Sequence, residues 1–262
     1  MSAKRYQPVR RIKRVNAEGV LVEQFDVARS LPVALFRASH PSRGALVALG
    51  VTVAAALAGR STREVGLVLV TVLVGQFILG VQNDLVDRNR DRTHGREGKP
   101  IAEGYLDPGT ASFAIAVAVL LVVPLSIANG RIAGSIHLVI LLVAMLGNAG
   151  LLRRGRLSFL TWALTFGGFA GFLSYGGWGG EGDGGAPTVA LVVCGALIGV
   201  GLHVLAALPG LVDENADGWR TLPLTLALRT GAPRLLAITV VYLVVMLAVT
   251  VFAGANFGLV AA

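Results

Sequence analysis

The chain is poor in charged, aromatic and cysteine residues, and each shortage excludes a class of protein. Only 15% of its 262 residues are charged and 6% are aromatic, whereas 54% are hydrophobic. That leaves too little charge to cover the surface of a water-soluble domain of this length. The single cysteine, Cys194, excludes an internal disulfide and a cysteine metal cluster. The composition therefore indicates a membrane protein.

Apolar stretches recur along almost the whole chain. A helix of about 20 residues crosses a hydrocarbon core of about 30 Å. By this measure the sequence predicts seven membrane spans, at about 44–59, 65–83, 110–129, 132–152, 157–176, 187–209 and 235–254. The expected fold class is all-α, a polytopic membrane helix bundle.

The first 30 residues are basic and polar and contain no cleavable apolar segment. We therefore expect 1–30 to be a basic cytoplasmic arm and 31–262 to be the transmembrane domain. With a cytoplasmic amino terminus, 20 of the 23 Lys and Arg residues lie on the cytoplasmic side, in keeping with the positive-inside rule. Topology and attraction to anionic lipid then explain the net charge of +8, so no nucleic-acid partner is expected.

The basic residues also indicate a source. Arginine outnumbers lysine by 20 to 3, and Ala, Gly and Val are abundant. This bias is typical of a GC-rich bacterial genome, so the predicted location is a bacterial cytoplasmic membrane.

Two predicted cytoplasmic loops, 84–107 and 210–222, concentrate acidic residues where the topology predicts basic ones. They hold nine of the fifteen Asp and Glu residues in the chain. We expect both loops to be catalytic.

The first of these loops places several oxygen ligands on one helix face. If the second span continues as a helix, Asn83, Asp87 and Asp91 recur every four residues, and Asp84 lies one turn before Asp87. Carboxylates at that spacing repel one another unless cations lie among them. Magnesium is the expected cation, because it binds carboxylate, water and phosphate oxygens.

The same stretch carries a resemblance to a known family. Residues 83–91 read NDLVDRNRD, a pattern NDxxDxxxD that resembles the first signature of the UbiA superfamily of intramembrane prenyltransferases. Residues 99–104, KPIAEG, are similar to the continuation of that signature. The likeness extends over about 30–254. It departs in length, because the family usually has nine spans and this chain ends soon after the seventh.

The second signature of the family, DxxxD, follows the sixth span and precedes a Gly and a Thr-Leu-Pro-like segment. Two alignments are open here. By spacing, Asp213 and Asp217 form DxxxD and share a helix face. If the alignment is anchored on Gly218, the two acids of the family fall on Gly210 and Glu214, and one ligand is lost.

The resemblance implies magnesium-dependent transfer of a prenyl group from a prenyl diphosphate to an aromatic or lipid-soluble acceptor within the membrane. Magnesium ions held between the two motifs would neutralise the leaving diphosphate. The catalytic candidates are Asp84, Asp87 and Asp91. The candidate metal ligands are Asn83, Asp87, Asp91, Asp213, Glu214 and Asp217. The candidate substrate-binding residues are Arg92, Lys99, Asn148, Arg153 and Arg220.

Polar residues inside the spans are candidates for function by default. Asn148 is placed among the substrate-binding residues because it precedes basic residues at the cytoplasmic end of its span. His137 and His203 are expected to be structural, with partners on neighbouring helices or backbone carbonyls.

Other functions compete with this one. A terpene cyclase or a polyprenyl-phosphate phosphoribosyltransferase on the same scaffold would keep the first motif. A transporter would carry its acids near the bilayer midplane, whereas these lie at helix ends. An inactive truncated remnant would account for Gly210 and the missing spans.

Overall fold

The computed structural model describes residues 11–15, 21–177 and 185–258, so parts of the predicted basic arm lie outside the described residues. The chain divides into two units. Unit 1 contains residues 1–47 and 73–120, and unit 2 contains residues 48–72 and 121–262. Helices α2 (Pro41–Leu57), α3 (Thr62–Thr93) and α5 (Pro108–Ala128) contribute to both units.

Unit 1 begins with an element that the sequence analysis did not predict. Strands β1 (Arg11–Val15) and β2 (Leu21–Phe25) form an antiparallel hairpin within the arm, which is an exception to the all-α class. A search for apolar segments of about 20 residues does not detect strands of five residues, whose backbone groups bond to each other. The 3-10 turn η1 (Val27–Arg29) and helix α1 (Leu31–Ala38) follow the hairpin.

The core of unit 1 joins α1 to the short helix α4 (Pro100–Glu103) and to neighbouring turns of α3 and α5. Pro100 starts α4, because its missing N–H is not needed in a first turn, and Gly104 ends it with a φ of 85°. The core consists of buried Ala34, Ala38, Val81, Ile101, Tyr105, Leu106 and Ala111. It fixes α4 against the end of α3.

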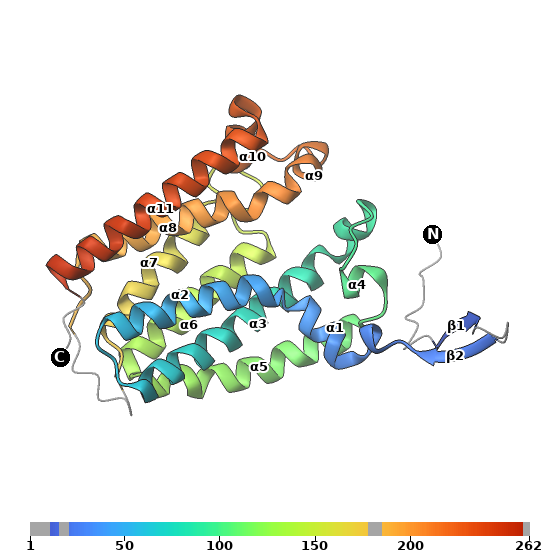
Figure 1. Cartoon of the computed structure of the whole chain (residues 1–262), viewed down its shortest axis with the longest axis horizontal. Coiled ribbons are helices and arrows are strands. Elements are labelled where there is room, and N and C mark those ends of the chain that lie inside the picture. Colours follow the sequence, from blue (N-terminus) through green and yellow to red (C-terminus); the bar gives the residue numbers. More distant parts are fainter. Residues whose placement is uncertain (1–10, 16–20, 178–184, 259–262) are drawn as a thin grey trace. The chain divides into compact units, whose positions relative to one another are not determined.

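Unit 2 is a series of packed helices. Its further elements are α6 (Arg131–Ala149), α7 (Leu160–Ser174), α8 (Val189–Ala207), η3 (Leu208–Gly210), α9 (Leu211–Ala216), α10 (Leu222–Thr230) and α11 (Ala232–Phe257). Helix α7 packs against α6 and α8, and α11 runs alongside α8 (Figure 1). A methyl group on Gly199 would lie 2.5 Å from the carbonyl oxygen of Trp162. Glycine thus lets α7 and α8 approach closely, as small residues do in membrane helices.

Five helical segments are long and apolar enough to cross a membrane: α3, α5, α6, Val189–Ala216 and α11. The predicted spans 44–59 and 157–176 correspond to α2, with 17 residues, and α7, with 15. Helix α2 matches the predicted length but is too short to be a spanning helix, and it is followed by Gly59 with a positive φ. Helix α7 begins three residues later and ends two residues earlier than the predicted span. The helical membrane class is confirmed, with five helices of spanning length where seven were predicted.

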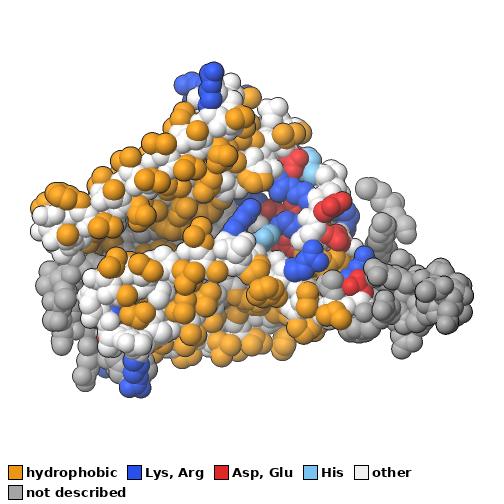
Figure 2. Space-filling view, viewed as in Figure 1, with side chains coloured by type: hydrophobic (Ala, Val, Ile, Leu, Met, Phe, Trp, Pro, Cys, Tyr) orange, Lys and Arg blue, Asp and Glu red, His pale blue; other side chains and the backbone are white. Residues whose placement is uncertain are grey.

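The helix surfaces fit a lipid environment. Large hydrophobic side chains are exposed along them, including Leu120 on α5 at 74% and Phe252 on α11 at 64%. Figure 2 shows hydrophobic side chains over the lengths of the helices, with acidic and basic side chains gathered near α4 in unit 1. Apolar surface of this extent is unfavourable in water, whereas lipid tails solvate it.

Gly80 on α3 packs directly against the junction of α1 and α2, where an added methyl group would overlap the carbonyl oxygen of Ser39. We expect Gly80→Ala to lower the free energy of unfolding by about 1–3 kcal/mol through overpacking. Gly66→Ala is the matched control, because this site on the same helix has open space around it. It should be neutral or stabilising by up to about 1 kcal/mol. Melting temperatures in detergent check both, and equal values would contradict the close approach.

Candidate active site

The first motif lies where α3 continues beyond its apolar segment. The helix extends to Thr93, as the sequence analysis expected. Val81 in the core is followed one turn later by Asp84, so the buried face of α3 changes from apolar to acidic. Asp84, Asp87 and Asp91 are only 1%, 8% and 1% exposed. Three buried carboxylates on one helix require compensating charge.

Lys99 supplies part of that charge. Its Nζ lies 2.9 Å from Oδ1 of Asp84 and 3.6 Å from Oδ2 of Asp91. The side chain is 13% exposed, so these ion pairs are only weakly screened by water. Lys99 immediately precedes Pro100, the first residue of α4, so the helix start sets its position. The structure therefore brings this predicted substrate-binding residue into the acidic cluster.

His40 completes the cluster from the junction between α1 and α2. Its Nε2 lies 3.1 Å from Nζ of Lys99 and 3.7 Å from Oδ1 of Asp84. Burial, followed by the positive charges of Lys99 and Arg43, lowers the pKa of His40 to about 4, against the opposing effect of Asp87. The ring is therefore neutral at pH 7, and its Nε2 can accept a hydrogen bond from the Lys99 ammonium.

The other acidic groups have partial compensation. Nε of Arg96 lies 3.7 Å from Oδ1 of Asp91, and the amide nitrogen of Asn83 donates to Oδ2 of Asp87 at 3.1 Å. Oδ2 of Asp84 makes no hydrogen bond of ordinary geometry to any described residue, although the N–H of Ile101 lies nearby. Buried oxygens with so few donors are costly.

This donor set fits a hard divalent cation in its chemistry. Buried carboxylate oxygens that lack hydrogen-bond donors are typical magnesium ligands. Within the described ranges, however, no three His, Cys, Asp or Glu side chains are placed to hold a metal ion as they lie. The Lys99 ammonium lies close to both Asp84 and Asp91 and supplies a positive charge shared by the two acids.

Arg92, the other basic candidate in unit 1, has a different place. Its side chain is exposed, and its Nε donates to the carbonyl oxygen of Ala102 at 3.2 Å. Arg92 therefore ties α4 to α3.

In the second motif, Glu214 is the buried acid. Asp213 is half-buried, and Asp217 is exposed at the residue after α9. The hydroxyl of Thr221 donates to Oε2 of Glu214 at 2.6 Å, and its oxygen accepts from the N–H of Leu224 at 3.2 Å. Thr221 is the N-cap of α10, so Glu214 is fastened to the start of that helix.

The remaining substrate-binding candidates lie in unit 2 around Trp219. Nη1 of Arg153 donates to the carbonyl oxygen of Asn148 at 3.1 Å, and its guanidinium lies 5.5 Å from the centre of the Trp219 ring. The backbone N–H of Arg220 donates to the carbonyl oxygen of Arg154 at 2.9 Å. These contacts join the turns before α7 to the segment after α9.

The two intramembrane histidines have partners within the protein. His137 donates from Nδ1 to Ser126 at 2.8 Å, since the Ser126 hydroxyl itself donates to Val122. Nε2 of His203 lies 2.9 Å from the hydroxyl of Ser158. Both contacts agree with the structural role that was expected.

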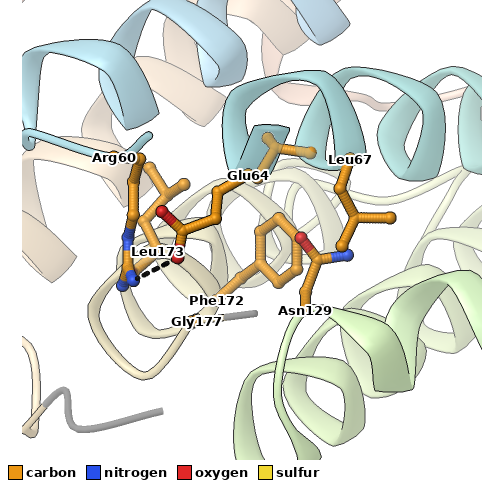
Figure 3. Close-up of a pocket in the computed structure, with 9 residues that line it drawn as sticks. Arg60, Glu64, Leu67, Asn129, Phe172, Leu173 and Gly177 are labelled. Carbon is orange, nitrogen blue, oxygen red and sulfur yellow. Dashed lines mark hydrogen bonds and ion pairs between the residues drawn. The ribbon is translucent and has the colours of Figure 1, made fainter. Parts of the chain in front are cut away.

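A small pocket in unit 2 contains none of the predicted site residues (Figure 3). Nη2 of Arg60 donates to the carbonyl oxygen of Leu173 at 2.8 Å, and Nη1 lies 3.5 Å from Oε1 of Glu64. The Asn129 amide nitrogen donates to Thr71 at 2.9 Å. Each of these polar groups has a partner within the protein, so the pocket is interpreted as a structural feature of the helix ends.

Sequence reasoning missed His40, Arg96 and Thr221. His40 is distant in sequence from the motif and belongs to no recognisable pattern, so only packing reveals it. Thr221 carried a signal, since a Thr followed by Leu-Pro is typical of a helix N-cap with proline in the first turn.

No family model, curated protein or solved structure matches the chain.

Thr221→Ala should lower the free energy of unfolding by about 1–2 kcal/mol, because it removes a helix cap and a buried hydroxyl donor to Glu214. Thr221→Ser keeps both bonds and should restore most of the stability. Thr230→Ala is the control, since that hydroxyl donates to local backbone carbonyls. Thermal unfolding in detergent measures all three. Equal losses in the Ala and Ser variants at 221 would exclude the capping role.

Proposed function

We propose that the protein is a magnesium-dependent prenyltransferase that acts on a prenyl diphosphate and an aromatic or lipid-soluble acceptor in the membrane. The buried cluster of Asp84, Asp87, Asp91 and Lys99 at the end of a helix of spanning length carries the proposal. A carboxylate cluster at such a helix end suits an amphiphile with a diphosphate head and an apolar tail. The resemblance of residues 83–91 to the first UbiA signature supports the same activity.

Within unit 1, Asp87 and Asp91 would hold magnesium, with Asn83 beside them. The ion would neutralise the diphosphate as its bond to the prenyl carbon breaks. Asp84 would hold Lys99 beside the metal site before substrate binds, since its Oδ1 lies 2.9 Å from the Lys99 Nζ. Lys99 would bind a phosphate oxygen, and the surrounding apolar helices would exclude water from the allylic cation.

The second motif would contribute through Glu214. Its burial and its bond to Thr221 hold the carboxylate in one orientation, whereas Asp217 is exposed. An oriented carboxylate loses less freedom on binding a metal than an exposed one. This favours the alignment anchored on Gly218.

We further propose a bacterial cytoplasmic membrane and a cytoplasmic amino terminus. The uneven distribution of arginine and lysine supports this orientation through the positive-inside rule. Helices α2 and α7 would lie within the bilayer beside the five helices of spanning length, because both are apolar.

Asp87→Ala and Asp91→Ala should each reduce diphosphate release by about a hundredfold or more, because each removes a ligand that stabilises the leaving group. Purified full-length protein would be supplied with magnesium, a panel of radiolabelled prenyl diphosphates and a membrane lipid extract. Glu97→Ala is the matched control, since it removes an exposed acid of the same loop. Full magnesium-dependent activity in either Asp variant would exclude the first motif as the metal site. A labelled cyclic hydrocarbon instead of a prenylated lipid would indicate a cyclase.

Glu214→Gln should raise the magnesium concentration for half-maximal activity by about tenfold or more, because it removes an oriented negative charge. The amide oxygen can still accept the Thr221 hydrogen bond, so the fold is preserved. Asp217→Asn should change the value less than about twofold, since that carboxylate is exposed. The reverse order would support the alignment by spacing, and no effect from either substitution would remove the second motif from the mechanism.

A further inference from the structure

The Lys99 ammonium and a magnesium ion would compete for the same carboxylates. A Lys side chain has three N–H donors, and the Lys99 Nζ has three acceptors around it: Oδ1 of Asp84, Oδ2 of Asp91 and Nε2 of His40. A divalent cation close to these carboxylates would be strongly repelled by an ammonium at this distance. Metal binding at Asp91 therefore requires the Lys99 side chain to leave.

We propose that Lys99 is the resting cation of the site, meaning that its ammonium pairs with the carboxylates before substrate enters and is positioned there by His40. When magnesium binds, the ammonium moves to the diphosphate. This inference rests on the proposed function and concerns how metal binding at that site is regulated. It makes metal and diphosphate binding mutually dependent, since each favours the arrangement in which Lys99 has left the carboxylates.

The side chain can move without disturbing the backbone. The N–H of Lys99 donates to Oε1 of Glu103 at 3.0 Å, so α4 holds the main chain independently of the ion pairs. Gly98, the residue before Lys99, has a φ of 75°, which favours glycine and fixes the turn. The four-carbon stem of lysine then provides the freedom for its ammonium to change partners.

His40 is a positioning residue that acts through Lys99. It is one of two non-glycine residues with a positive φ in the described part of the chain, at 50°. Such a conformation costs free energy and persists only where the surroundings impose it. Here the close contact between Gly80 and the backbone of Ser39 holds the junction between α1 and α2 in place. In that position the His40 ring lies within hydrogen-bond distance of the Lys99 ammonium.

Manganese binding without diphosphate provides the test, because it needs no catalytic turnover. Full-length protein in detergent would be titrated with Mn²⁺, and electron paramagnetic resonance would measure the free ion. Lys99→Met should bind Mn²⁺ at least about tenfold more tightly than the unsubstituted protein, within the usual range of coupling between sites. Lys99→Arg keeps the charge, and Arg88→Met removes a nearby charge that bonds to the Leu85 carbonyl. Both should stay within about threefold of the unsubstituted protein.

A second readout uses a prenyl thiodiphosphate that cannot ionise readily. At saturating Mn²⁺, Lys99→Met should retain less of this radiolabelled compound, because the ammonium is no longer available to the phosphate. If Lys99→Met does not fold, His40→Leu takes its place, since it releases the ammonium from its third acceptor. His40→Leu should tighten Mn²⁺ binding by about threefold, and His40→Gln, which keeps an acceptor, should change it less.

The outcomes separate this inference from the proposed function. Mn²⁺ binding that Asp87→Ala abolishes, but that neither Lys99→Met nor His40→Leu tightens, overturns the resting cation and leaves the metal site intact. If the unsubstituted protein and every variant fail to bind Mn²⁺, even with the thiodiphosphate present, the proposed function and the inference both fall.

Discussion

The ion pair between Asp84 and Lys99 is the contact on which the polar end of unit 1 depends. Burial raises the pKa of Asp84, which is 1% exposed, and the charge of Lys99, with its Nζ 2.9 Å away, opposes that effect and favours the ionised carboxylate. The apolar core beneath the pair places the two residues, because it packs α4 against α3. Pro100 and Gly104 mark the start and end of the short helix that follows Lys99. The absence of a side chain at Gly80 lets the segment that contains His40 pack closely against α3. Packing thus assembles a charged cluster that no single segment contains.

The two acidic motifs are stabilised in different ways, and the difference bears on their roles. In unit 1, both oxygens of Asp84 and one oxygen of Asp91 are buried with no hydrogen bond of ordinary geometry to the described residues, and the ammonium of Lys99 lies close to both acids. Such a cluster is suited to exchange one cation for another. In unit 2, Glu214 accepts a hydrogen bond from the Thr221 hydroxyl, which also caps α10. That arrangement holds one carboxylate in place, which suits the supporting role in metal binding that we propose.

Lipid acts as the solvent for most of the remaining surface. Exposed leucine, valine and phenylalanine side chains along α5 and α11 would be unfavourable in water and are favourable against acyl chains. Inside, glycine replaces larger side chains where α7 meets α8, so dispersion contacts between backbones hold the helices together. Polar side chains in the apolar helices find internal partners, as His137 does with Ser126. In the described part of the chain, the acidic side chains of the first motif thus lie at the end of an apolar helix.

Local properties of the sequence determined the helical membrane class, the continuation of α3 to Thr93 and the buried acidic face of that helix, since apolar length and four-residue spacing act within one segment. They did not determine the bounds of α2 and α7, because the ends of these helices depend on the turns that join them to their neighbours. They also left open which acid of the second motif is buried, a choice made by the packing of Glu214 against Thr221. Only the tertiary structure brought His40 to Lys99, because contacts between residues far apart in sequence arise from the packing of whole helices and leave no local pattern.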